Sequence, residues 1–114
     1  MKNEHTERLI MDLKRASIEQ EVALWKRIAE DLEKPSRSQR SVNIFKIDQY
    51  TDEGDIVIVP GKVLGEGDLT KKVTVAAHHF SDGALAKINK SGKALTIQEL
   101  MKSNPKGQKV RILG

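Results

Sequence analysis

A run of four β-branched residues, Ile56 to Val59, constrains the fold of this chain more than any other stretch. Such side chains are stiff at χ1, and an unbroken run too short for a helix is typical of a strand buried on both faces. Pro60 lacks a backbone donor and Gly61 tolerates tight turns, so we expect pairing to end on that side and the chain to turn there. Glycines recur at 65–68, which predicts a second turn, and Thr74 to Ala77 predicts another strand.

Residues 6–34 have the apolar spacing of amphipathic helices. Ser17 and Gln20 have the spacing of a capping box, so we expect a first helix to end near Arg15 and a second to begin after Ser17. Trp25 is the only tryptophan, and we expect it to anchor the core rather than to stack on a base. The apolar stripe of the second helix comprises Val22, Trp25, Ile28, Ala29 and Leu32.

After residue 42 the pattern changes from long helices to short strands and helices that alternate. Residues 42–50 fit either a strand or a short helix, and we favour a helix capped by Asn43. Ser81 predicts the N-cap of a helix over residues 82–91, with Gly92 as its left-handed C-terminal residue. The remaining expected elements are a short strand at Ala94-Leu95, a helix opened by the capping box Thr96 to Glu99, a turn at 104–107 and a strand at 110–113.

These elements predict a mixed α/β fold in a single domain over residues 1–114. Its expected parts are N-terminal helices at 1–34, a basic arm at 35–41 and a core of strands and helices at 42–114. No stretch has the length of the crossover helices in a doubly wound sheet.

The charge of the chain indicates an anionic partner. Lys and Arg number 20 against 16 Asp and Glu, and charged residues make up 32% of the chain, above the ~25% that is usual for soluble domains. From Lys87 onward there are seven Lys or Arg and one acidic residue, Glu99, which is typical of a nucleic-acid-binding surface. The absence of cysteine excludes disulfides and thiolate metal sites. The polar N-terminus and the lack of a long apolar run predict a cytoplasmic protein.

The segment Lys34 to Ser41 carries three cations, three serines and no acidic residue. One interpretation is a solvated linker, because Pro35 disfavours helix and nothing apolar follows until Val42. The other is an arm that grips phosphates, because Arg and Ser side chains both donate to phosphate oxygens. The residues alone leave both interpretations open.

Three clusters invite a catalytic or metal-binding interpretation, and each fits poorly. Gly65-x-Gly67 lacks the third glycine of a dinucleotide fingerprint, and a strand rather than a helix is predicted after it. His78 and His79 would point to opposite faces of a strand and could not chelate one metal easily. The acidic residues from Asp48 to Asp55 lack calcium-loop spacing and favour a solvated turn. We expect no catalytic residues, no metal site and no cofactor, and hence no enzyme.

The succession of motifs along the chain resembles one protein family. The motifs are Leu32-Glu-Lys-Pro-Ser-Arg37, Val42-Asn43, Gly54-Asp-Ile-Val-Ile-Val-Pro-Gly-Lys-Val-Leu-Gly65, Val73-Thr-Val-Ala-Ala77, Phe80-Ser81, Asn104-Pro-Lys-Gly107 and Val110-Arg-Ile112. The family is that of the archaeal and eukaryotic large-ribosomal-subunit protein L eighteen e, which is related to the bacterial protein L fifteen. The resemblance covers essentially the whole chain, and the compact length is similar to the archaeal form.

The resemblance implies a structural constituent of the large ribosomal subunit, with an α/β core of irregular β-β-α turns behind an N-terminal helical stretch. The implied partners are large-subunit rRNA and neighbouring ribosomal proteins, with no membrane and no obligate homo-oligomer. Lys and Arg are expected to meet phosphates and 2′-hydroxyls rather than base edges. The expected RNA-binding residues are Lys34, Ser36, Arg37, Ser38, Arg40, Lys62, Lys71, Lys72, Lys106, Lys109 and Arg111.

Two other functions remain open. The chain could be a small protein-interaction module that docks through its amphipathic N-terminal helices, in which case nuclease would not separate it from its partners. It could also be an enzyme that uses the glycine turn at 65–68 as an anion cradle, which binding of a free nucleotide would support.

Overall fold

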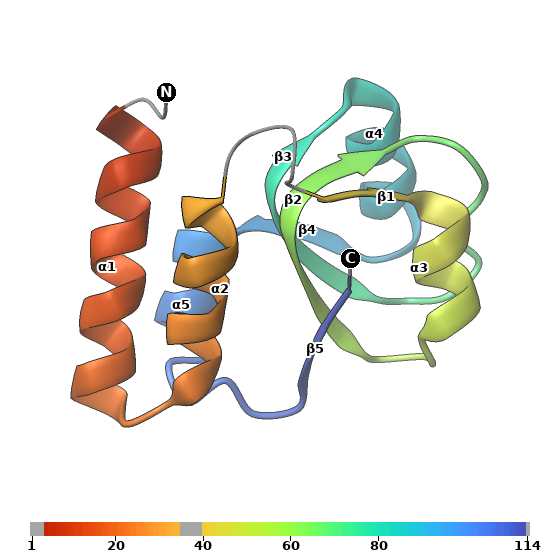
Figure 1. Cartoon of the computed structure of the whole chain (residues 1–114). Coiled ribbons are helices and arrows are strands. Elements are labelled where there is room, and N and C mark those ends of the chain that lie inside the picture. The colour runs from red at the N-terminus through yellow and green to blue at the C-terminus, as the bar shows by residue number, and fades with distance from the viewer. Residues whose placement is uncertain (1–3, 35–39, 114) are drawn as a thin grey trace.

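The computed structural model describes residues 4–34 and 40–113, with the backbone alone at Arg40 (Figure 1). Its elements are α1 (Glu4–Gln20), α2 (Ala23–Glu33), β1 (Arg40–Asn43), α3 (Ile44–Tyr50), β2 (Ile56–Leu64), β3 (Thr74–Phe80), α4 (Asp82–Ser91), β4 (Lys93–Thr96), α5 (Ile97–Ser103) and β5 (Val110–Ile112). The strands form one sheet in the order β1-β2-β3-β4, and β5 also pairs with β2. Every one of these pairings is parallel.

Helices cover both faces of the sheet, with α1, α2 and α5 on one side and α3 and α4 on the other (Figure 1). Because successive strand residues point to opposite faces, Ile58 packs with the α1/α2/α5 core while Val57 and Val59 pack with the α3/α4 core. The predicted mixed α/β class and the predicted strand buried on both faces are therefore confirmed. The crossovers between strands use helices of 7 to 10 residues or none. None of the described helices is long and apolar enough to cross a membrane.

The prediction that the chain turns at Pro60 and Gly61 was wrong, because β2 continues through both residues. On one edge β2 pairs with β3, with a register shift between Val59 and Lys62. The other edge is shared: β5 pairs with Ile56 to Ile58 and β1 pairs with Gly61 to Leu64. Pro60 therefore occupies the gap between β5 and β1, where its missing N–H leaves no ladder bond unmade and a bulge accommodates it.

The predicted helix boundary near Ser17 was also wrong. The first helix runs on to Gln20, and Ala23 begins the second. Glu21 is left-handed, with φ of 55°, and the Val22 N–H donates to the Ser17 carbonyl at 3.1 Å. This is the hydrogen-bond pattern of a Schellman C-cap. Because residue 21 is a glutamate rather than the usual glycine, the sequence did not predict this cap.

Local capping predictions were mostly confirmed. The Ser81 side chain accepts from the Ala84 N–H, and Thr96 with Glu99 forms the expected capping box. Asn43 precedes α3 as predicted but makes no side-chain capping bond. Gly92 has φ of −139° rather than a left-handed conformation. A Cβ there would lie 2.0 Å from the Val73 carbonyl oxygen, so glycine is required by close approach instead.

The core anchor and the C-terminal turn were predicted correctly. Trp25 is fully buried, and its indole N–H donates to the Pro105 carbonyl at 2.8 Å. The turn at 104–107 is closed by a bond from the Gly107 N–H to the Asn104 carbonyl at 2.9 Å. This turn therefore sits against α2, which lies 80 residues earlier in the chain.

Candidate nucleic-acid interface

Ser41, Lys62 and His79 form an exposed row across three neighbouring strands. The β1–β2 pairing sets Ser41 beside Lys62, and the β2–β3 pairing sets Lys62 beside His79. All three side chains are exposed, and each is followed by a residue that packs into the α3/α4 core. The row therefore lies on the α1/α2 face of the sheet, near the C-terminal ends of its strands. We call it the exposed row.

The predicted arm returns to the fold beside this row. Lys34 is at the C-terminus of α2, with its ammonium 3.3 Å from the Asp31 carboxylate. Ser36, Arg37 and Ser38 lie outside the described residues. Arg40 begins β1 and is paired with Gly61, one residue before Lys62. The arm was expected to extend through Ser41, but its last two residues belong to β1. A parallel pairing between segments 21 residues apart thus brings the last two residues of the arm, Arg40 and Ser41, beside Lys62.

The Lys62 ammonium is available to a ligand. Within the described part of the chain, no hydrogen bond or ion pair holds it. It is exposed on an element whose backbone is paired on both edges. A cation in this setting can meet a phosphate without first giving up an internal contact.

Four more of the predicted residues gather at the other end of β2. Lys72 precedes β3, while Lys109 and Arg111 flank Val110, which pairs with Ile56. Lys106 is in the C-terminal turn, where its ammonium lies 3.4 Å from the Gln20 carbonyl oxygen. A strand rises about 3.3 Å per residue, so roughly 20 Å separates this group from Lys62. The predicted residues therefore form two groups rather than one patch.

Two of the predicted cations turn toward the protein itself. The Lys71 ammonium donates to the Asp48 and Thr51 carbonyls at 2.5 and 2.6 Å. The Arg111 guanidinium donates to the Tyr50 carbonyl at 3.0 Å and lies 3.7 Å from the Asp55 carboxylate. All three carbonyls are at the C-terminus of α3, where a cation is favoured by the helix dipole.

Lys87 has the same kind of role and was not singled out in the sequence. Its ammonium donates to the Gly65 and Gly67 carbonyls at 2.7 and 2.5 Å, which holds the glycine loop against α4. The partners are 20 and 22 residues away, so no local pattern could have revealed the contact.

The prediction that His78 and His79 point to opposite faces was wrong. Their ring centroids are 4.1 Å apart, because the alternation of β3 is broken beside the bulge in β2. His78 is partly buried and its Nε2 lies 3.3 Å from the Thr6 hydroxyl oxygen of α1, whereas His79 is exposed. Burial, and then the nearby imidazoles of His79 and His5, lower the pKa of His78 to about 4. The His78 ring is therefore neutral at neutral pH.

The acidic segment forms a hydrogen-bonded turn. The Thr70 N–H and hydroxyl donate to the Asp48 carboxylate at 2.9 and 2.8 Å, which lowers the pKa of that carboxyl. The Asp55 carboxylate accepts from the Asp52 N–H at 2.8 Å. In the described residues, no group of three or more His, Asp or Glu side chains is arranged to hold a metal ion.

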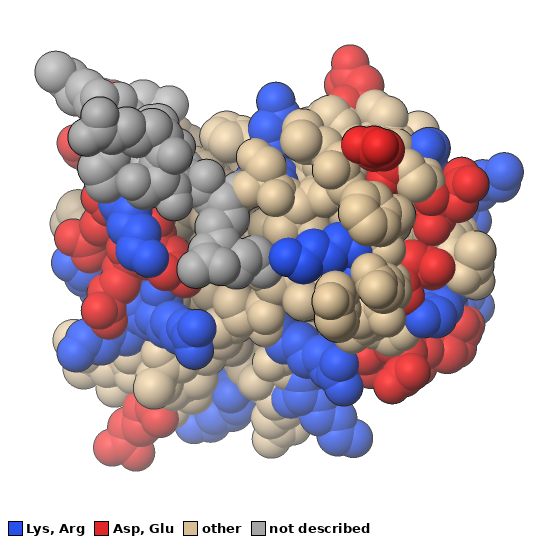
Figure 2. Space-filling model, turned by 45° about the vertical axis from the view of Figure 1, so that its right-hand side comes forward, with Lys and Arg blue, Asp and Glu red and all other residues tan. Residues whose placement is uncertain are grey.

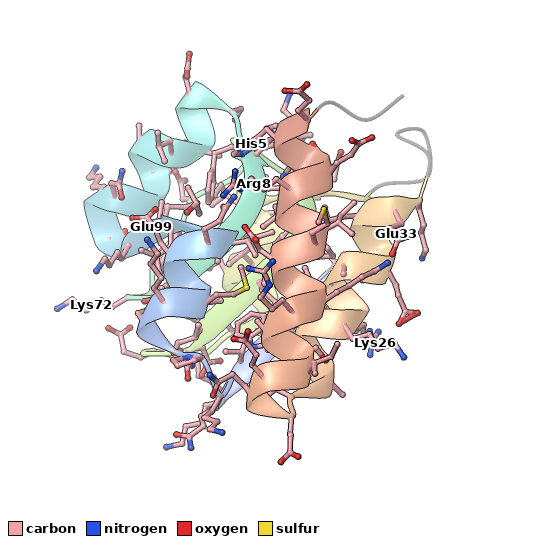
Figure 3. The ribbon with its side chains drawn as sticks, turned by 90° about the vertical axis from the view of Figure 1, so that its left-hand side faces the viewer. His5, Arg8, Lys26, Glu33, Lys72 and Glu99 are labelled. Atoms are coloured by element: carbon pink, nitrogen blue, oxygen red, sulfur yellow. The ribbon has the colours of Figure 1, made fainter. Side chains whose placement is uncertain are left out.

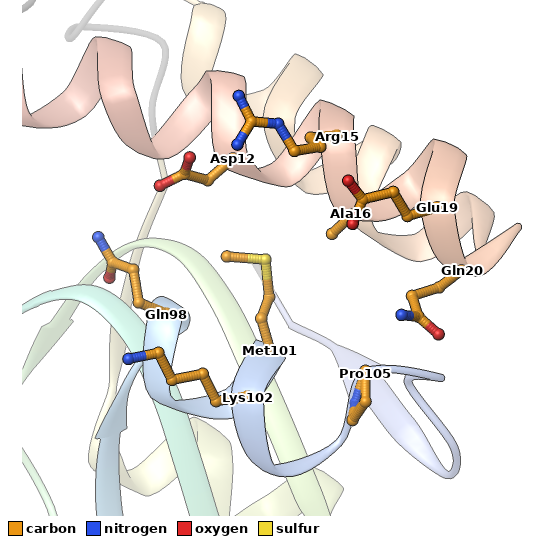
Figure 4. Close-up of a pocket in the computed structure, with 9 residues that line it drawn as sticks. All are labelled: Asp12, Arg15, Ala16, Glu19, Gln20, Gln98, Met101, Lys102 and Pro105. Carbon is orange, nitrogen blue, oxygen red and sulfur yellow. The ribbon is translucent and has the colours of Figure 1, made fainter.

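Charges of both signs also occur elsewhere on the described surface. Basic and acidic side chains are interspersed on the face shown in Figure 2. On the helical side, Lys26 and Glu33 project from α2 and Arg8 from α1 (Figure 3). A groove between α1 and α5 likewise mixes signs, with Asp12, Arg15 and Lys102 around Met101 (Figure 4). Residues 4–33 contain eight acidic and five basic residues, so the helical hairpin formed by α1 and α2 is acidic although the whole chain is basic.

Comparison of the sequence with known proteins identifies its family. Residues 23–96 match the family model of ribosomal proteins that comprises 50S-L15, 50S-L18e and the 60S protein L twenty-seven A. The chain belongs to this ribosomal protein family. Its relatives include proteins named "Large ribosomal subunit protein eL18" from Methanococcus maripaludis, at 47% identity over 97% of this chain and 93% of the relative, and from Methanosphaerula palustris, at 50% identity over 92% and 88%. A third, from Methanoregula boonei, is 48% identical over 92% of this chain and 88% of the relative.

The predicted family resemblance is thus confirmed, and these relatives are named as ribosomal proteins rather than as enzymes. The segment matched to the ribosomal family extends from α2 to β4. It contains the exposed row and the whole arm, and it ends before Lys106, Lys109 and Arg111.

Proposed function

We propose that this chain is a structural constituent of the large ribosomal subunit and binds large-subunit rRNA. The observation that carries the proposal is the pairing of β1 with β2, which brings Arg40 and Ser41, the last two residues of the arm, beside Lys62. Among the described residues, none holds the Lys62 ammonium. The names of its relatives support the same assignment. Its partners would then be rRNA and neighbouring large-subunit proteins, and its location would be the ribosome in the cytoplasm.

Contact would be made through phosphates and riboses. A-form RNA hides its major-groove base edges, so cations on a rigid sheet meet the backbone first. The arm and Lys62 would form the main contact, and Lys72, Lys106 and Lys109 a second contact about 20 Å away. Lys71 and Arg111 would act mainly by holding α3 in place, because their donors already bind its carbonyls.

The chain would bind as a single domain. The core on the α1/α2 face contains Leu13 of α1, Trp25 of α2 and Ile58 of β2. The helical hairpin therefore shares its core with the sheet, and neither part buries its apolar side chains alone.

The test is a titration of transcribed large-subunit rRNA with the folded chain at several salt concentrations. With about six phosphate contacts, the logarithm of the affinity should fall with the logarithm of salt with a slope near −4 to −5. Lys62→Gln should weaken binding about three- to tenfold and reduce the slope by about 0.7 to 0.9. Lys26→Gln, an exposed lysine on α2, is the matched control and should leave both unchanged. A salt-independent affinity, or equal effects of the two variants, would contradict the proposal.

A protein-interaction module is the second candidate function, and one observation favours it. α1 exposes Met11 and Ile18, which are 63% and 78% accessible and lie on one helix face. If docking through this face were the main function, nuclease digestion of cell extracts would leave the chain with its partners. Under the rRNA proposal, digestion should release it from the large-subunit fraction.

A further inference from the structure

We propose that the outward face of α3 docks a cationic segment of a neighbouring protein. The face consists of Phe45, Lys46, Gln49 and Tyr50, all of which are exposed on one side of the helix. The two rings are 52% and 53% accessible. Exposed aromatic side chains are over-represented at protein interfaces, where they supply large contact area at little entropic cost. The inference rests on the proposed place of the chain in the large subunit.

The seven-residue helix that carries this face is held by hydrogen bonds at both ends. At its start, the Phe45 N–H donates to the Glu66 carbonyl at 3.0 Å. At its end, Lys71 and Arg111 hold the last carbonyls, and the Thr51 hydroxyl donates to the Ile47 carbonyl at 2.6 Å. A surface that is already ordered loses little conformational entropy on binding. The structure thus presents two aromatic rings on a fixed support.

The close approach of Gly67 fixes the position of Phe45 in particular. Gly67 has φ of 99°, and a Cβ built on it would lie 2.4 Å from the Phe45 Cβ. Lys87 holds the same loop through the Gly67 carbonyl. The absence of a side chain at residue 67 is therefore what allows Phe45 to rest against the loop.

The excess of acidic residues around α3 favours a cationic ligand. Residues 44–55 and 66–72 together with Arg111 contain six acidic and four basic residues, although the whole chain is basic. Two of the four cations, Lys71 and Arg111, already donate to α3 carbonyls. Three of the six carboxylates, those of Asp48, Glu53 and Asp55, likewise accept hydrogen bonds within the chain. The carboxylates of Asp52, Glu53, Glu66 and Asp68 are on exposed residues around the helix. These four carboxylates would repel RNA phosphates, whereas an Arg or Lys could stack on a ring and pair with a carboxylate.

The test uses the assembled large subunit and the absence of native cysteine. Tyr50→Cys and Lys62→Cys chains, each labelled with a benzophenone at the single thiol, are incorporated into large subunits and irradiated. The label at position 50 should form an adduct with a Lys- or Arg-rich protein segment, identified by mass spectrometry. The label at position 62 should form an adduct with rRNA.

The outcomes separate the two proposals. An rRNA adduct at position 62 together with an rRNA adduct, a second copy of this chain, or no adduct at position 50 would overturn the docking inference and leave the rRNA function standing. No rRNA adduct at position 62 would count against the function itself. As a second measurement, Tyr50→Ser should reduce incorporation at least threefold in competition with the unmodified chain. Leu85→Ser, which removes an exposed apolar side chain of α4, should not.

Discussion

Cations beside β2 have two opposite arrangements. At the end near Ile56, Arg111 lies against the Asp55 carboxylate and Lys71 donates to the last carbonyls of α3. At the end near Leu64, Lys62 is exposed between Ser41 and His79, and no contact in the described residues holds its ammonium. The strand is the same and the residue types are the same. The difference lies in whether the donors of each cation already have acceptors within the chain.

This difference separates two roles that sequence analysis treats alike. A lysine whose ammonium binds buried or partly buried carbonyls stabilises the fold, because removing it leaves acceptors without a donor. A lysine whose ammonium meets only water adds little to folding and is free to bind phosphate. Measurements of stability and of RNA affinity should therefore respond to different lysines.

The largest expected effect compares one left-handed glycine at each end of β2. Gly67→Ala should destabilise the fold by about 2–5 kcal/mol, since it combines an unfavourable φ of 99° with a Cβ placed 2.4 Å from the Phe45 Cβ. Gly54→Ala should cost only about 1–2 kcal/mol, because its φ is 87° but no atom lies within 4 Å of the new Cβ. Denaturant unfolding of both variants checks this. Equal losses of stability would show that the loop at 65–68 can move away from Phe45 at no cost.

The next effect contrasts the two kinds of lysine directly. Lys71→Met should destabilise the fold by about 1–3 kcal/mol, because the Asp48 and Thr51 carbonyls lose their shared donor. Lys62→Met should change stability by less than about 0.5 kcal/mol. The rRNA affinities should rank the other way, with the greater loss for Lys62→Met. If Lys71→Met reduced the free energy of rRNA binding by more than it reduced the free energy of unfolding, the inward assignment of Lys71 would be wrong.

The third effect is a pH dependence located at His78, beside the exposed row. The pKa of His78 is about 4 in the fold, against 6.5 in its ordinary state. Above pH 6.5 the ring is neutral in both the folded and the unfolded chain, so its contribution to stability is complete there. As the pH falls from 6.5 to 4, the unfolded chain takes up a proton that the folded chain does not, and stability declines. We expect a loss of about 1–2 kcal/mol, which allows for the partial exposure of the ring.

The measurement is chemical denaturation of the wild-type chain and His78→Gln between pH 7.5 and 4. Glutamine keeps a polar group near the Thr6 hydroxyl but does not titrate. Because every other residue is the same in both proteins, the difference between the two curves isolates His78. Parallel curves would mean that His78 is protonated in the fold as readily as in the unfolded chain.

Sequence patterns predicted the elements that depend on neighbours along the chain. The capping box of Thr96 and Glu99 and the burial of Trp25 follow from spacings of a few residues, and both were predicted. The parallel pairing of Ser41 with Lys62 depends on contacts between strands that are distant in sequence. No local period encodes that pairing, so the predicted cations could be named but not grouped.

Pro60 shows the same limit within one strand. A proline in a β-branched run predicts the end of pairing when the partners of the strand are unknown. Here two different strands share one edge of β2, and the proline falls between them. The inward contacts of Lys71 and Lys87 likewise required the positions of α3 and the glycine loop, which lie about 20 residues away.

The smallest expected effect tests whether the Ile56 end of β2 also contacts RNA. Lys109 has a left-handed φ of 59° just before β5, so Lys109→Gly should stabilise the fold by about 0.5–1 kcal/mol through relief of backbone strain. Glu21→Gly, where φ is 55°, is the matched control and should stabilise the fold by a similar amount. If Lys109 meets a phosphate, only its variant should also reduce the salt slope of rRNA binding, by up to about 0.9. Because Lys109→Gly raises stability, such a loss could not be attributed to unfolding, and an unchanged slope would remove Lys109 from the proposed RNA contact.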